Sequence, residues 1–184
     1  MWARFCGFLL RLLGWTKDSG PVAEKKAIIL GVPHTTFMDF VVSYLFYTSH
    51  NAGKAHVMIK KEMFVWPIKG LLRAMGGVPM DRSNATALIK GIVDEFNSQE
   101  FFVLAMCPEG TRKPVKKWKT GYHTIAKAAN CPVYLGYFDW GTKHISVGQK
   151  FELSDDPRAD TEKIQQIYEE MKLTGKHPEN YITH

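Results

Sequence analysis

The feature that most constrains the fold is a pair of short, continuously apolar segments, each followed directly by polar residues. Residues 27–31 read Ala-Ile-Ile-Leu-Gly, and residues 101–106 read Phe-Phe-Val-Leu-Ala-Met. Runs this short, with no polar alternation, are typical of strands that are buried on both faces. Parallel strands of this kind need a crossover between them, usually a helix that covers the sheet. The sequence therefore predicts an α/β fold.

The segments between and after these strands extend the pattern. Apolar periodicity predicts a helix over residues 36–49, with Thr35 or Thr36 as its N-cap. Gly76 and Gly77 predict a turn. The other expected elements are helices over residues 84–96 (capped by Ser83 or Asn84) and 160–173, and strands over residues 56–59, 133–138 and 145–147. Strands that alternate with helices, without a linker or repeat, predict one domain over residues 1–184: a mixed sheet flanked by helices.

Residues 1–15 are expected to form an amphipathic N-terminal helix. At about 100° per residue, Arg4, Gly7, Arg11 and Gly14 fall on one strip, and apolar side chains fill the remaining arc. The apolar run is shorter than the roughly 20 residues that span a membrane, and it lacks a signal-peptide cleavage site. We expect this helix to lie in a membrane interface with its arginines at anionic headgroups. The alternative is a helix that packs its apolar face on its own domain.

The charge balance favours anionic partners. The formal net charge is +6 and the pI is about 9.2, which suits lipid headgroups, phosphorylated substrates or nucleic acid. The densest basic cluster comprises Lys113, Lys116, Lys117 and Lys119 around Trp118. Because this cluster is short and its basic and aromatic pattern does not repeat, no nucleic-acid partner is expected.

The cysteines point to a reducing compartment. Cys6, Cys107 and Cys131 are odd in number and widely separated, and no pair has the spacing of zinc ligands. Free thiols persist in reducing compartments, where disulfides are rare. We therefore expect a cytoplasmic protein without a metal site, held peripherally on the inner face of the membrane through residues 1–15.

His34 and Asp39 stand where the first buried strand ends and a helix begins. Ligands of open α/β sheets bind at that edge, and an imidazole there can act as a general base near neutral pH. Five residues turn about 140° in an unbroken helix, so the pair can meet only if His34 precedes the helix. The structural alternative is a buried His bonded to backbone and an Asp at a helix N-terminus. On spacing alone, that alternative is favoured.

A second polar segment, residues 107–112, follows the strand over residues 101–106. Gly110 permits a close backbone approach, Thr111 offers a hydroxyl, and Arg112 presents a fork that suits phosphate. Arg82, after the two glycines, offers a second phosphate contact, although an arginine in a loop is by itself a weak signal.

In this order and at these separations, the segments resemble the glycerolipid acyltransferase family, whose best-known members acylate lysophosphatidic acid. The resemblance spans residues 27–138. The matching positions are His34 and Asp39 for the His-x4-Asp motif, Arg82 for the second motif, Pro108, Glu109, Gly110, Thr111 and Arg112 for Phe-Pro-Glu-Gly-Thr-Arg, and residues 131–134 for the proline-containing strand. The chain departs from the family at Pro33, where Asn is usual, and at Cys107, where an aromatic residue is usual. Both positions border the site and leave the acceptor lipid open.

The resemblance implies acyl transfer from an acyl thioester to a lipid-like hydroxyl, with His34 as the base and Asp39 orienting it. The substrate-binding residues that it implies are Arg82, Glu109, Gly110, Thr111, Arg112 and Lys119. The donor would be acyl-coenzyme A or acyl-acyl carrier protein, and no cofactor is expected. A Gly-x-Ser-x-Gly elbow, a P-loop and a dinucleotide fingerprint are absent from the sequence.

Three alternatives remain open at this stage. The acceptor could be a non-phosphorylated lipid, or the chain could be a non-catalytic lipid-binding module on the same fold. Cys107 could act as a nucleophile, although an inert thiol at a strand end is the favoured interpretation.

Overall fold

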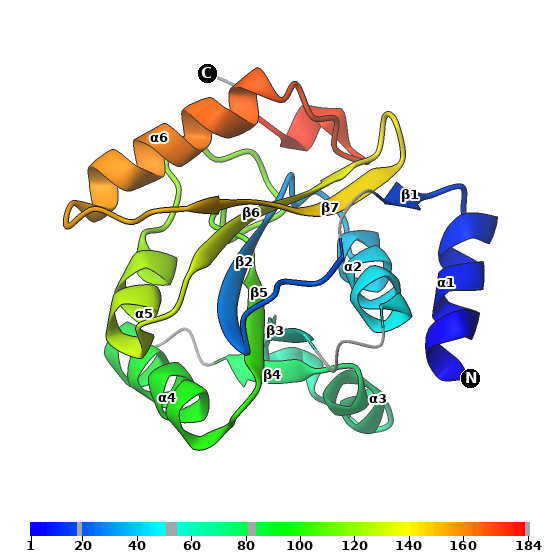
Figure 1. The fold of residues 1–184 in the computed structure, drawn as a ribbon, viewed down its shortest axis with the longest axis horizontal. Helices are drawn as coiled ribbons and strands as arrows, with labels where there is room; N and C mark the ends of the chain where they lie inside the picture. Colours follow the sequence, from blue (N-terminus) through cyan, green and yellow to red (C-terminus); the bar gives the residue numbers. More distant parts are fainter. Residues whose placement is uncertain (18–19, 51–54, 81–83, 183–184) are drawn as a thin grey trace.

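A seven-stranded sheet with helices on both faces forms the frame of the molecule (Figure 1). The computed structural model describes residues 1–17, 20–50, 55–80 and 84–182. The strands are β1 (Thr16–Lys17), β2 (Lys26–Val32), β3 (Ala55–Lys60), β4 (Gly77–Met80), β5 (Phe102–Met106), β6 (Val133–Asp139) and β7 (His144–Phe151). The helices are α1 (Trp2–Leu12), α2 (Met38–Ser49), α3 (Ile68–Ala74), α4 (Ala85–Ser98), α5 (Gly121–Ala129) and α6 (Pro157–Glu170), with 3-10 turns η1 (Lys61–Met63) and η2 (Pro178–Asn180). These elements form the expected single α/β domain.

The sheet has the order β1-β7-β6-β2-β5-β3-β4 and is mixed, as expected. β2 lies at its centre and pairs in parallel with both β5 and β6, with Ile28 opposite Leu104 and Val133. β7 returns antiparallel to β6. Because β2, β5 and β6 run in the same direction, the residues that follow each of them meet at one edge of the sheet. That edge carries the polar segments.

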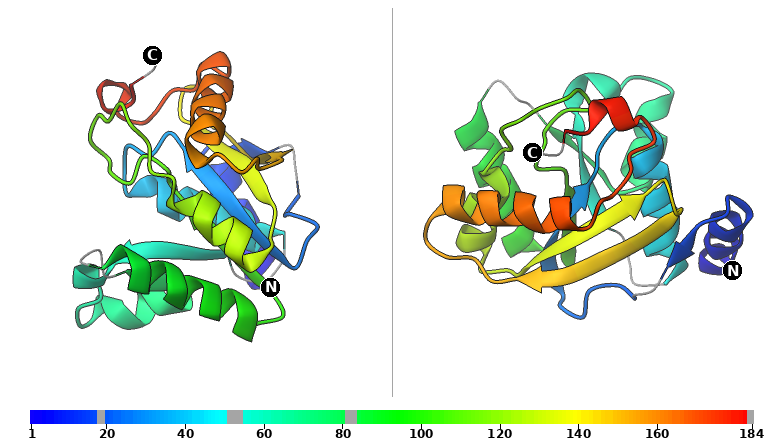
Figure 2. Two further views of the ribbon diagram at one scale, coloured as in Figure 1. Left: turned by 90° about the vertical axis from the view of Figure 1, so that its left-hand side faces the viewer. Right: turned by 90° about the horizontal axis from the view of Figure 1, so that it is seen from above.

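The core explains why β2 is continuously apolar. Alternate side chains of β2 enter two different hydrophobic clusters. Ile28 and Leu30 pack on the face covered by α4, α5 and α6. Ala27 and Ile29 pack on the opposite face, which α1 and α2 cover (Figures 1 and 2). A strand that is covered on both faces has no position for a polar side chain.

The start of α2 differs from the expectation. The helix begins at Met38, and neither Thr35 nor Thr36 is its N-cap: that position is Phe37, whose side chain makes no capping bond. The carboxylate of Asp39 instead accepts the backbone N–H groups of Thr35 and Thr36. These two N–H groups precede the helix, so Asp39 holds the loop before α2 and does not replace a capping side chain. The N–H of Met38, the first helical residue, donates to the Thr36 hydroxyl at 3.4 Å.

Two further expectations need correction. The segment after Gly76 is not only a turn, because Gly77–Met80 forms the edge strand β4 beside β3. Pro79 is tolerated there because an edge strand can lack one N–H donor. The last long helix spans Pro157–Glu170 rather than residues 160–173, and Asp156 caps it. Asn84 caps α4 as expected, through the N–H of Ala87, whereas Ser83 lies outside the described residues.

The N-terminal helix is amphipathic and divides its apolar residues between two environments. Cys6 and Leu10 are buried in the cluster shared with α2, and the Trp2 indole N–H donates to the Tyr44 hydroxyl at 3.1 Å. The side chains left exposed on α1 include Trp2, Phe5, Phe8 and Leu12. The helix therefore packs on its own domain and still presents an apolar outer surface. Within the described residues, no helix has both the length and the apolar character needed to cross a membrane.

Candidate active site

His34 and Asp39 contact each other at the carboxyl end of β2. His34 lies in the loop before α2, and Asp39 is the second residue of the helix. The distance from His34 Nδ1 to Asp39 Oδ2 is 3.1 Å. The Asp39 side chain is 2% exposed and that of His34 is 24% exposed. Because Asp39 contacts Nδ1, Nε2 is the ring nitrogen that Asp39 leaves free.

Asp39 is held by hydrogen bonds to both of its carboxylate oxygens. Besides His34, Oδ2 accepts the backbone N–H groups of Thr35 and Thr36, both at 2.9 Å. Oδ1 accepts the indole N–H of Trp140 at 2.8 Å. A buried carboxylate is costly unless such donors surround it. These donors also fix the direction in which the carboxylate faces the imidazole.

Trp140 is a site residue that the sequence reasoning missed. It follows β6 in the turn to β7, and its ring packs edge-on against Trp15, with centroids 4.9 Å apart. The Lys176 ammonium lies 4.9 Å from the centroid of the Trp140 ring. Its position in the chain could have revealed it. Because β6 pairs in parallel with β2, a tryptophan just after β6 lies near the end of β2.

Glu109 joins the two motif segments. Its carboxylate accepts the backbone N–H of His34, with distances of 2.9 and 3.2 Å to its two oxygens. The residue is only 4% exposed, so this carboxylate contacts protein backbone rather than open solvent. Burial raises the pKa of Glu109 to about 7, against the lowering effect of the His34 N–H. Glu109 thereby fixes the loop after β5 to the residue that carries the imidazole.

The neighbouring motif residues shape the loop after β5. Gly110 adopts a left-handed conformation, with φ +68, and a Cβ there would lie 3.2 Å from Lys119 Cγ. The Lys119 backbone N–H donates to the Pro108 carbonyl at 2.7 Å. Thr111 Oγ1 accepts the backbone N–H of Lys113 at 3.2 Å. Lys119 therefore supports the loop with its backbone and with the apolar part of its side chain.

Beside this loop lies an open pocket of about 390 Å³. Its lining residues are Thr35, Thr111, Arg112, Lys113, His177 and Asn180. The structure thus brings Thr111 and Arg112 close to the His34 segment, through Thr35. Arg82 lies outside the described residues.

The environment of His34 favours its protonated form. Burial opposes the charge, but the neighbouring Cys107 sulfur and the Asp39 carboxylate outweigh burial and raise the pKa of His34. Cys107 and His34 are therefore electrostatically linked, although the aromatic residue usual at position 107 in the family is absent. Among the described residues, no three His, Cys, Asp or Glu side chains form a group that could hold a metal ion.

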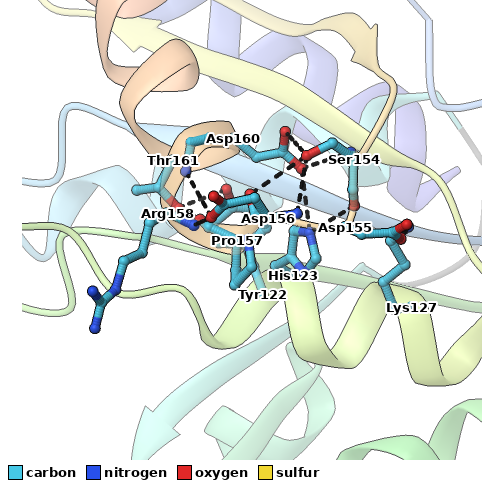
Figure 3. Close-up of polar contacts among 11 residues, drawn as sticks. Tyr122, His123, Lys127, Ser154, Asp155, Asp156, Pro157, Arg158, Asp160 and Thr161 are labelled. Atoms are coloured by element: carbon cyan, nitrogen blue, oxygen red, sulfur yellow. Dashed lines mark hydrogen bonds and ion pairs between the residues drawn. The ribbon is translucent and has the colours of Figure 1, made fainter.

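A second His-Asp pair in the molecule has a different environment. His123 Nε2 lies 3.2 Å from Asp160 Oδ2 and 3.1 Å from the Ser154 carbonyl. Asp160 also accepts the N–H and the hydroxyl of Ser154, both at 2.8 Å (Figure 3). Because the His123 and Asp160 side chains are 7% and 2% exposed, substrate cannot reach them. This pair fixes the start of α6 on α5.

The fold and this site define a class: an α/β protein with a His-Asp pair at the carboxyl edge of its sheet, beside a basic pocket. The sequence model described as Acyltransferase matches residues 17–135, more than half of the chain, and the chain belongs to this glycerolipid acyltransferase family. The comparison with curated proteins found no match. The protein is therefore an acyltransferase. Trp140 and His177 lie beyond the matched residues.

Proposed function

We propose that this acyltransferase moves a fatty acyl group from an acyl thioester to the hydroxyl of a phosphorylated, lipid-like acceptor such as a lysophospholipid or glycerol phosphate. The observation that carries the proposal is the 3.1 Å contact between His34 Nδ1 and Asp39 Oδ2. This contact leaves Nε2 for proton transfer. The next residue, Thr35, lines a pocket that also contains the cationic side chains of Arg112 and Lys113.

In the proposed reaction His34 is a general base. Nε2 takes the proton of the acceptor hydroxyl while that oxygen attacks the thioester carbonyl carbon. The tetrahedral intermediate then collapses, the carbon–sulfur bond breaks, and the leaving thiolate takes the proton back from the imidazolium. Asp39 stabilises the imidazolium and keeps the ring in one tautomer. General-base catalysis of this kind contributes about 10²- to 10⁴-fold in rate.

The acceptor phosphate is proposed to bind Thr111 and Arg112, with Arg82 as a further contact. Arg112 makes no ion pair with a described residue, so its guanidinium is available to an anion. Glu109 and Gly110 act by holding this loop in place. The donor is proposed to be acyl-coenzyme A or acyl-acyl carrier protein, with Lys119 near its phosphate groups. No cofactor takes part in the proposed reaction.

The outer surface of α1 is proposed to bind a membrane and to hold the enzyme peripherally on the inner, cytoplasmic face. Trp2, Phe5 and Phe8 are about half exposed there. Arg4 and Arg11 on the same helix are suited to anionic headgroups. This location would bring the active site to its lipid substrate.

The test is acyl transfer from palmitoyl-coenzyme A, measured as product by mass spectrometry, with lysophosphatidic acid or monoacylglycerol as acceptor. His34→Ala is compared with His50→Ala, a histidine at the far end of α2. We expect transfer to lysophosphatidic acid to fall by at least about a hundredfold in His34→Ala and to persist in His50→Ala. Faster transfer to monoacylglycerol would instead favour a non-phosphorylated acceptor, and equal rates would contradict recognition of the phosphate. No transfer from coenzyme A or carrier-protein donors would favour a lipid-binding module.

A further inference from the structure

The C-terminal segment, residues 172–182, lies across the edge of the active site. Figure 2 shows it beside the loop that follows β5. The Thr174 carbonyl accepts the backbone N–H of Trp140 at 2.8 Å, and the Thr174 N–H donates to Asp139 Oδ1 at 2.9 Å. Further along the segment, the His177 N–H donates to Thr35 Oγ1 at 3.3 Å. The segment is thus attached to Trp140, which bonds Asp39, and to Thr35, which follows His34.

Close packing reinforces this attachment. Gly175 is buried against Thr35, and a Cβ at this position would lie 2.6 Å from Thr35 Cγ2. Only a glycine lets the chain pass so near to Thr35. The position of His177 relative to the motif loop is therefore set by backbone contacts and not by its side chain alone.

The open pocket that the segment helps to line has the chemistry of an anion site. Arg112 and Lys113 enter it from the motif loop, and His177 and Asn180 enter it from the C-terminal segment. Neither Arg112 nor Lys113 forms an ion pair within the described part of the chain. Thr35 and Thr111 complete the lining.

One carboxylate stands near these donors. Glu179 Oε1 lies 3.5 Å from His177 Nδ1, and the Glu179 side chain is 70% exposed. It does not line the pocket. A guanidinium, an ammonium, an imidazole and an amide around a cavity of about 390 Å³ match a phosphate group, because phosphate oxygens can accept from each of these donors.

We propose that His177 and Asn180 complete a phosphate subsite with Arg112 and Lys113, so that the C-terminal segment takes part in substrate recognition. The ligand is a phosphate monoester or diester group of a substrate. Assigning that group to the acceptor or to the donor rests on the proposed function. The subsite itself rests only on the geometry of the pocket.

A binding experiment tests the subsite without requiring catalysis. The side-chain NMR signals of the histidines are followed while inorganic phosphate, glycerol 3-phosphate or glycerol is added. His177→Asn assigns the signal of His177, and His50→Asn serves as the matched control. We expect the His177 signal to shift saturably with both phosphates and not with glycerol, and the affinity to fall about tenfold or more in Lys113→Gln. An unmoved His177 signal, or an affinity unchanged in Lys113→Gln, would overturn the proposal.

Kinetics then identify the source of the phosphate. In His177→Asn we expect the KM of one substrate to rise about tenfold, with a smaller change in kcat. A rise confined to lysophosphatidic acid assigns the subsite to the acceptor, and a rise confined to acyl-coenzyme A assigns it to the donor. Unchanged KM values for both substrates, with His50→Asn as the reference, would refute substrate recognition by this segment. If the enzyme transfers no acyl group at all, the proposed function fails and the NMR result still decides the subsite.

Discussion

Trp140 donates its indole N–H to Asp39 Oδ1 at 2.8 Å, across 101 residues of sequence. The other oxygen of Asp39 faces His34 Nδ1. The tryptophan and the imidazole thus bond to opposite oxygens of one buried carboxylate. Any contribution that the tryptophan makes to catalysis passes through the orientation of Asp39.

Replacing Trp140 by Phe keeps an aromatic ring and removes the N–H. We expect kcat to fall about tenfold with little change in KM, because a buried carboxylate oxygen left without its donor costs about 1 to 3 kcal/mol and loses its fixed direction. Trp15→Phe is the matched control, since Trp15 packs against Trp140. Equal losses of kcat in the two variants would mean that packing, and not the hydrogen bond, is responsible.

Replacing Cys107 by Ala should alter the pH dependence of the reaction. Burial lowers the pKa of His34, and the Cys107 sulfur is the largest of the effects that raise it. A general base must be deprotonated, so activity rises with pH through the pKa of His34. Without the sulfur this pKa falls, and we expect the acidic limb of the rate profile to move to lower pH. The measurement is kcat/KM as a function of pH. If the acidic limb of Cys107→Ala lies at the same pH as that of the wild type, Cys107 does not influence the base.

Replacing Glu109 by Gln should change the pH dependence of stability. Burial raises the pKa of Glu109 to about 7 from its ordinary value of 4.5. The folded protein then binds this proton more tightly than the unfolded chain does, so this carboxyl destabilises the fold increasingly between about pH 5 and pH 7. The amide of the variant cannot ionise. The free energy of unfolding of Glu109→Gln should therefore rise relative to that of the wild type, by up to about 3 kcal/mol across that window. Denaturant unfolding at about pH 5 and pH 8 measures this difference, and a constant difference would contradict it.

Replacing Phe5 and Phe8 together by Ser tests the outer surface of α1. Both side chains are about half exposed, so the melting temperature should change little. If these side chains enter a bilayer, each substitution removes roughly 1.5 to 3 kcal/mol of favourable transfer free energy. Flotation of the double variant with phosphatidylglycerol vesicles should therefore fall by more than about tenfold. Phe101→Ser is the control, because Phe101 is also exposed but precedes β5, at the opposite end of that strand from the site. Unchanged flotation of the double variant would exclude α1 as the membrane contact.

The elements that the sequence predicted well are those whose signal is local. Residues 27–31 are apolar at every position because both faces of β2 are covered. Asn84 was recognisable as a cap because its side chain reaches an N–H three residues away. The acyltransferase family was likewise recognisable from the order and spacing of short motifs, which the family match confirmed.

The contacts that complete the site were not predictable in this way. The turn after β6 brings Trp140 to Asp39, and the C-terminal segment brings His177 to Thr35, across 101 and 142 residues. Neither contact leaves a periodicity or a motif in the chain. The sequence by itself predicted the strands β2, β3, β5, β6 and β7 and the family, and the family motif singled out His34 and Asp39. Only the tertiary structure decided what surrounds them, because strands that are distant in sequence end at one edge of the sheet, and the residues that follow them meet only after the sheet has formed.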